Sequence, residues 1–166
     1  MKRIFLILVV AILIYVLGRQ VVLLFVPDET RITWLLQEVV DRFNERDNSG
    51  CRAHLASDYQ HKSPRLDNGR LRALLARLFL KGVHPETHAF RYRADLQTLE
   101  EGSVSVGGGN PKTANVRAIV HLSEEQKGKT IVLWEVRLEA ELEKAVSGWE
   151  IKRTRHETID GRMPVR

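Results

Sequence analysis

The chain has 166 residues, 26 of them basic and 21 acidic, and a formal net charge of +5. Three basic residues and no acidic residue precede Pro27, so the remaining 23 basic side chains barely outnumber the 21 acidic ones. This balance disfavours nucleic-acid binding, which needs a clustered basic surface. The single cysteine, Cys51, excludes an intramolecular disulfide, and such a residue is more typical of a small buried side chain than of a nucleophile.

The N-terminal segment is strongly apolar. Residues 4–17 and 21–26 form two uninterrupted apolar runs, separated by a short polar break, after a basic start at Lys2 and Arg3. A helix over residues 4–26 would be about 34 Å long, which is enough to cross a bilayer.

We predict an uncleaved signal-anchor at residues 1–27, which would make the chain a single-pass membrane protein. Lys2 and Arg3 are expected to keep the N-terminus in the cytoplasm, so the domain at residues 28–166 would be extracytoplasmic. A cleaved signal peptide is one alternative, because residues 4–17 alone have the length of its hydrophobic core. A buried helix of the domain is the other.

Three helices are predicted after Pro27. The first begins at Asp28, which can cap free backbone N–H groups, and carries an apolar stripe at helical spacing: Ile32, Leu35, Leu36, Val39, Val40 and Phe43. A short second helix is expected over residues 51–56. The third runs from a second capping residue, Asp67, to Lys81, with Gly82 after it, and its apolar side is formed by Leu71, Leu74, Leu75, Leu78 and Phe79.

Beyond His84 the apolar residues alternate with polar ones, which predicts strands with one buried face. Four such segments cover residues 88–96, 113–122, 130–143 and 147–153. The third is long for a strand and is expected to bend or bulge. The fold class is therefore α+β: three N-terminal helices packed on an antiparallel sheet of about four strands, preceded by one transmembrane helix.

The order of these parts resembles the nuclear transport factor 2-like (NTF2-like) superfamily, which has a cystatin-like α+β cone. The resemblance covers residues 30–159. It rests on the long first helix ending at Phe43, on "LASDYQHKSP" with Asp58 and Tyr59, and on "SGWEIKR", which is similar to a Gly-Trp-x-Ile closing strand. It implies a curved sheet that closes the cone. One departure is that few residues separate Tyr59 from the third helix, which leaves little room for the hairpin that many members place there.

Alternation along the strands predicts few catalytic groups inside the cone. If Trp149 and Ile151 face the core, His156 lies on the outer face unless a bulge intervenes, while Glu157 keeps the inward position. No strand places an inward carboxylate at mid-sheet, which a resemblance to the ketosteroid isomerases of this superfamily would require. A metal site is not predicted, because His54, Asp58 and His61 have no matching ligand pair elsewhere.

We therefore predict a non-catalytic binding or assembly module with no cofactor. It would bind a small apolar ligand in the cone, through Tyr59, His88, Tyr92 and Trp134, or a protein partner on its sheet. The resemblance also implies a possible homodimer through the exposed sheet face. The alternative is a small-molecule isomerase, dehydratase or cyclase that uses Tyr59, His61 and His88 at the cone mouth as a base with an oriented partner.

Overall fold

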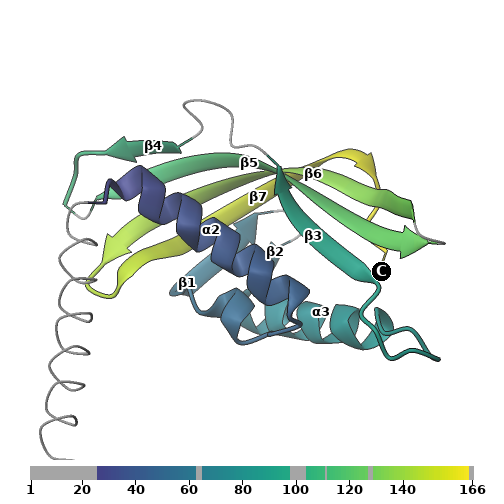
Figure 1. The fold of residues 1–166 in the computed structure, drawn as a ribbon. Helices are drawn as coiled ribbons and strands as arrows, with labels where there is room; N and C mark the ends of the chain where they lie inside the picture. The colour runs from purple at the N-terminus through teal and green to yellow at the C-terminus, as the bar shows by residue number, and fades with distance from the viewer. Residues whose placement is uncertain (1–25, 63–64, 98–103, 111, 127–128, 165–166) are drawn as a thin grey trace, which may run out of the picture.

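One curved sheet of seven strands bends around helix α2 (Asp28–Asn44) in the computed structural model (Figure 1). The structure describes residues 26–62, 65–97, 104–110, 112–126 and 129–164. Helix α3 (Asn68–Lys81) packs against the edge formed by strands β1 (Leu55–Lys62) and β2 (Arg65–Asp67). We call the face of the sheet that α2 covers the inner face, and the opposite one the outer face.

The remaining strands are β3 (Tyr92–Gln97), β4 (Val104–Gly107), β5 (Thr113–Gln126), β6 (Lys129–Ala145) and β7 (Gly148–Gly161). The order across the sheet is β2-β1-β7-β6-β5-β3, and β4 pairs with β5 beside β3. All neighbours are antiparallel except β1 and β7, which run parallel. The first and last strands of the domain therefore lie side by side.

Helix α2 forms where the sequence predicts it, because its apolar stripe has somewhere to pack. Ile32, Leu35 and Leu36 are buried against inner-face residues of β5, β6 and β7, including Ala114, Leu142, Trp149 and Ile151. The C-terminal end of the helix is tied to β3 by Asn44, whose side-chain amide donates to the Ala94 carbonyl and accepts from the Ala94 N–H. Helix α3 is capped as expected, since the Asp67 carboxylate accepts the Arg70 N–H.

The α+β class is correct, but the predicted elements are wrong in number. Two α helices and a seven-stranded sheet replace the predicted three helices and four strands in the described part of the chain. The predicted second helix is a 3₁₀ turn, Gly50–Arg52, followed by β1, where pairing with β7 overrides local helix propensity. Strands β2 and β4 have 3 and 4 residues, too few to show a period of two.

The hairpin for which the sequence seemed to leave little room is present. Strands β1 and β2 pair antiparallel from Gln60↔Asp67 to Lys62↔Arg65, and Asp67 then caps α3 directly. The predicted bulge in the long strand is also found in β6. Leu122 pairs with Trp134 and Ser123 with Val132, which leaves Leu133 as the extra residue.

The predicted transmembrane helix is not among the helices of the described residues, none of which is long and apolar enough to span a membrane. The prediction concerns residues 4–26, and all of these except Val26 fall within residues 1–25. Those residues lie outside the part of the chain that the structure describes.

Asp28 links the start of α2 to the sheet through side-chain hydrogen bonds. Its carboxylate accepts hydrogen bonds from Lys144 at 2.7 Å, from Lys112 at 3.3 Å and from the Trp149 indole N–H at 3.2 Å. The hydrogen bond from Lys144 is the main cause that lowers the Asp28 pKa to about 2, against the opposing effect of burial. The prediction that Asp28 caps the helix is wrong: Pro27 occupies the N-cap position without a side-chain hydrogen bond, and the Asp28 carboxylate binds side chains of the sheet instead.

We expect Asp28→Asn to lower the free energy of unfolding at pH 7 by about 1–2 kcal/mol, because the pKa of Asp28 is lower in the folded than in the unfolded chain. A lowered pKa contributes stability above the unfolded value of 3.8, and this contribution is lost as the pH falls toward about 2. Urea denaturation measures the free energy of unfolding of wild type and variant. The difference between the two should thus be constant from pH 7 to 5 and shrink at pH 3. The matched control is Asp160→Asn, an exposed β7 residue, for which an equal loss would contradict this role.

Candidate functional site

A bulge in β7 changes which side chains of that strand face inward. Ile151 pairs with Leu142 and Arg153 pairs with Glu141, so Lys152 is an extra residue opposite β6. Beyond it, Thr154 and His156 lie opposite Ala140 and Leu138 on the inner face. The prediction that His156 faces outward is therefore wrong, because it depended on an unbroken strand.

The same bulge turns Glu157 outward, where the sequence analysis expected an inward residue. Its carboxylate accepts a hydrogen bond from Arg137 at 3.2 Å, and 72% of its side chain is exposed. The outer face thus gains a charge pair, while the inner face gains an imidazole.

Four side chains from β1 and β7 form a continuous hydrogen-bonded chain on the inner face. The Tyr59 hydroxyl lies 2.6 Å from Thr154 Oγ1, and His61 Nδ1 lies 2.6 Å from the same atom. His61 Nε2 then lies 2.8 Å from His156 Nδ1. We call Tyr59, Thr154, His61 and His156 the polar chain. Its first three members are buried and His156 is half-buried.

One arrangement of protons along this chain would leave a donor at its end. Burial raises the pKa of Tyr59, so its hydroxyl keeps a proton, which it can donate to Thr154 Oγ1. If the Thr154 hydroxyl donates to His61 Nδ1, the His61 proton lies on Nε2 and is directed at His156 Nδ1. In this arrangement His156 carries its own proton on Nε2.

His156 is a neutral imidazole in this environment. Burial lowers its pKa from the ordinary value of 6.5. A second proton would also have to enter the hydrogen bond at Nδ1, which already receives the proton of His61. In the arrangement of protons described above, the polar chain ends in an N–H donor at neutral pH, without a formal charge.

The surroundings of His156 are apolar and incompletely covered. The Trp134 ring meets the imidazole edge-on, with centroids 5.4 Å apart, and its indole N–H donates to Thr158. Leu138 lies opposite His156 on β6, and Val120 lies on the same inner face of β5. Trp134, Leu138 and Val120 are all only half-buried, although they point toward the helices. A half-buried apolar surface thus adjoins the His156 imidazole.

The structure brings together some of the predicted site residues and separates others. Tyr59 and His61 belong to the polar chain, and Trp134 lies beside it. Tyr92 and Trp134 pack on the same small core cluster around Leu122. His88 is an exposed turn residue with φ of 54°, whose backbone N–H donates to the His84 carbonyl. It is not one of the residues that contact the polar chain in the described part of the structure. Their roles in ligand binding or catalysis stay predictions.

Thr154 and His156 are the members that sequence reasoning missed. Both lie beyond the bulge, where the alternation that starts at Trp149 assigns them to the wrong face. The sequence did contain one signal for them. Thr154, His156 and Thr158 alternate with the charged residues Arg153, Arg155 and Glu157, which indicates that the two sets lie on opposite faces of the strand.

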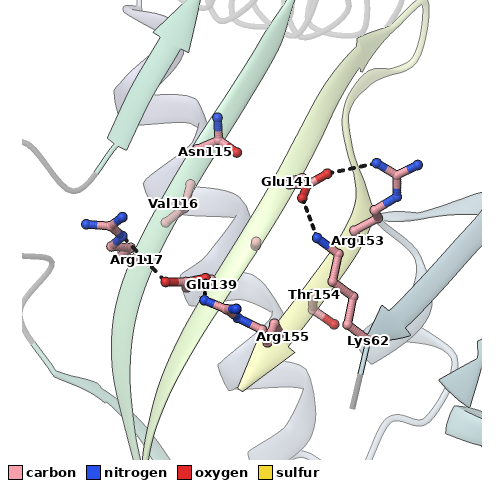
Figure 2. A pocket seen from close by; sticks show the side chains of 10 residues that line it. Lys62, Asn115, Val116, Arg117, Glu139, Glu141, Arg153, Thr154 and Arg155 are labelled. Carbon is pink, nitrogen blue, oxygen red and sulfur yellow. Dashed lines mark hydrogen bonds and ion pairs between the residues drawn. The ribbon is translucent and has the colours of Figure 1, made fainter. Parts of the chain in front are cut away.

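The outer face carries rows of paired charges across four strands (Figure 2). Glu139 lies between Arg117 at 3.6 Å and Arg155 at 2.7 Å, and Glu141 lies between Lys62 and Arg153, both at 3.1 Å. These side chains line a shallow groove above β5, β6 and β7. Each carboxylate has two cationic neighbours, so these six side chains together carry two more positive than negative charges.

Sequence comparison matches the chain to no described protein family and to no curated protein. Solved structures do share its fold. An NTF2-like protein with a cystatin-like fold from Novosphingobium aromaticivorans is 14% identical, covers 90% of this chain and 92% of its own, and gives a TM-score of 0.64. A ketosteroid isomerase-like protein from Erwinia carotovora atroseptica is 18% identical to this chain. The match covers 82% of this chain and 99% of that protein, with a TM-score of 0.56.

A third structure, a protein of unknown function with a cystatin-like fold from Nostoc punctiforme, is 15% identical over 80% of this chain and 91% of its own, with a TM-score of 0.58. At such identities the similarity shows the fold alone. The resemblance noted in the sequence is confirmed to that extent: the chain has the cystatin-like fold of NTF2-like proteins.

We expect Thr154→Val, which keeps the shape of the side chain, to lower the free energy of unfolding by about 1–3 kcal/mol. The substitution leaves the buried Tyr59 hydroxyl and His61 Nδ1 without their shared partner. Urea denaturation measures the change, and Thr154→Ser, which retains the hydroxyl, should stay close to wild type. If the Val and Ser variants are equally stable, the polar chain contributes nothing to the fold.

Proposed function

We propose that this NTF2-like domain binds a small, largely apolar molecule on the half-covered part of its inner face. The His156 Nε2–H group would donate a hydrogen bond to a polar atom of the ligand, and Trp134, Leu138 and Val120 would contact its apolar body. The observation that carries the proposal is the polar chain, which is buried at Tyr59 and ends in a half-buried imidazole.

The polar chain links the buried core to the half-covered part of the inner face. Tyr59, Thr154 and His61 are buried, and the hydrogen bond between His61 Nε2 and His156 Nδ1 extends the chain to an imidazole among half-buried apolar side chains. Small-molecule sites typically combine an apolar lining with a few fixed polar groups. The hydrogen bond between His61 Nε2 and His156 Nδ1 holds the His156 ring in one orientation.

A protein partner on the sheet, including a homodimer, is the other occupant that the sequence analysis considered. In the outer groove Glu139 and Glu141 each contact two cationic side chains, so two copies of this surface would both present excess positive charge, and burying ion pairs gains little free energy. The inner face therefore supports the proposed function better than the outer one.

Catalysis is a second candidate, favoured by the lowered pKa of His156, since a neutral imidazole can accept a proton. Against it, the polar chain contains no carboxylate that would stabilise an imidazolium. His88, one of three residues of the predicted catalytic set, is not in the chain. If catalysis occurred, its rate should fall as the pH decreases through the His156 pKa.

The cellular location stays a proposal that rests on the sequence alone. An anchor at residues 4–26 would place the domain outside the cytoplasm. Protease added to intact cells would then degrade the domain, whereas protection until the cells are lysed would contradict this location.

Native mass spectrometry of the purified full chain tests the proposed binding. We expect a co-purified small molecule on wild type and on the control Glu157→Gln, which alters the neighbouring outward residue. His156→Phe should lose this extra mass. It also removes a hydrogen-bond partner of the buried His61 ring and is expected to lower the melting temperature, so circular dichroism at the assay temperature must show that the variant is folded. A bare wild-type monomer would contradict the proposal, and a bare dimer would favour an assembly module.

A further inference from the structure

A second pocket opens at the end of the sheet where β3 meets the C-terminal end of the described chain. We call it the rim pocket. Its volume is about 560 Å³, which is within the range of small-molecule sites. It is lined by Arg91, Tyr92, Glu124, Leu133, Arg162, Met163 and Pro164.

Glu124 gives the rim pocket a buried carboxylate with fixed partners. Only 6% of its side chain is exposed, and it forms an ion pair with Arg91 and accepts a hydrogen bond from Gln126 at 2.8 Å. Burial alone would raise the pKa of Glu124, but the hydrogen bonds from Gln126 and Arg91 outweigh it and lower the pKa. The carboxylate is therefore ionised and its charge is balanced by Arg91.

Arg162 supplies a second cation that is not balanced. It is exposed, and among the described residues no carboxylate forms an ion pair with it. Its backbone is held in place, since the Arg162 N–H donates to the Leu133 carbonyl at 3.0 Å. The rim pocket thus carries a net charge of one positive unit.

The turn that presents Arg162 requires a glycine. Gly161 has φ of 71°, and a Cβ atom there would lie 2.1 Å from the Leu133 carbonyl oxygen. This close approach lets the chain turn across the β6 bulge and bring Arg162 and Met163 to the pocket wall.

The rest of the lining is apolar and leads toward the proposed ligand surface. The Tyr92 ring packs edge-on against Phe90, with centroids 5.8 Å apart, and belongs to the core cluster that includes Leu122 and Trp134. Trp134 in turn contacts His156. Tyr92 therefore connects the cationic rim with the aromatic end of the inner face.

We propose that the rim pocket selects ligands that carry a carboxylate on an apolar body, such as aromatic or acyl acids. The carboxylate would bind the Arg162 guanidinium, which can hold its two oxygens with two N–H groups, and the body would lie on Tyr92, Leu133 and Met163. A monoanion matches the single unbalanced charge, whereas a phosphate dianion would need a second open cation. This inference rests on the proposed function and names its ligand class.

The test compares two probes of the same shape, 2-naphthoate and the uncharged 2-naphthamide. The full chain is held in nanodiscs of uncharged lipid, and calorimetric titrations are corrected with empty nanodiscs. We expect wild type to bind the naphthoate more tightly than the amide by about tenfold, and Arg162→Gln to abolish this preference. The matched control is Arg77→Gln, the same charge change on the exposed side of α3, which should keep the preference.

Each outcome separates this inference from the proposed function. Equal binding of both probes to wild type, or loss of preference in both arginine variants, would overturn the carboxylate site and leave inner-face binding in place. A preference that survives Arg162→Gln and is lost in His156→Phe would place the carboxylate at the polar chain instead, which also overturns it. If neither probe binds the wild-type chain, this ligand class is wrong, whereas a co-purified uncharged molecule would still support the proposed function.

Discussion

The interior of the domain depends on one extra residue, Lys152, in the last strand. The bulge lets the apolar half of β7, with Trp149 and Ile151, and its polar half, with Thr154 and His156, point to the same side of the sheet. Lys152 itself is held on the other side by Asp58 of β1 at 2.8 Å and Glu143 of β6 at 3.8 Å. An ion pair with each neighbouring strand thus stabilises the register on which the polar chain relies.

The inner face consequently has two parts with different physical characters. Around Trp149 and Ile151 it is closed by α2, whose start is fastened by Asp28 to Lys144 and Trp149. Around His156 and Trp134 the same face is only half-covered. One end therefore supplies most of the packing, and the other carries the proposed ligand surface. The outer face is rich in charged side chains that form ion pairs between neighbouring strands.

The sequence predicts the elements that depend on interactions between neighbouring residues, and it fails for those that depend on pairing between distant segments. Helix α2, helix α3 and strands β5, β6 and β7 follow from local periodicity and capping, and the structure confirms them. Strand β1 does not, because it is defined by pairing with β7, about a hundred residues away in sequence, while its own residues alternate irregularly.

The candidate site shows the same limit. Tyr59 and His61 stood out as a hydroxyl and an imidazole two residues apart, but their partners depend on where β7 bulges. Alternation alone places His156 on the outer face and Glu157 on the inner face, the reverse of the structure. Nothing in the sequence between Trp149 and Glu157 marks Lys152 as the extra residue. Register is a property of two strands, so a pattern within one strand cannot contain it.

The parallel pairing of β1 with β7 has a consequence for synthesis of the protein. Tyr59 and Thr154, whose hydroxyls are 2.6 Å apart, are separated by 95 positions in the chain. A ribosome must therefore complete nearly the whole domain before the polar chain can close, although α2 and α3 can form much earlier. A nascent or C-terminally truncated chain would leave the edge of β1 unpaired and His61 without Thr154. The polar chain, and with it the proposed ligand surface, therefore requires the last strand of the domain.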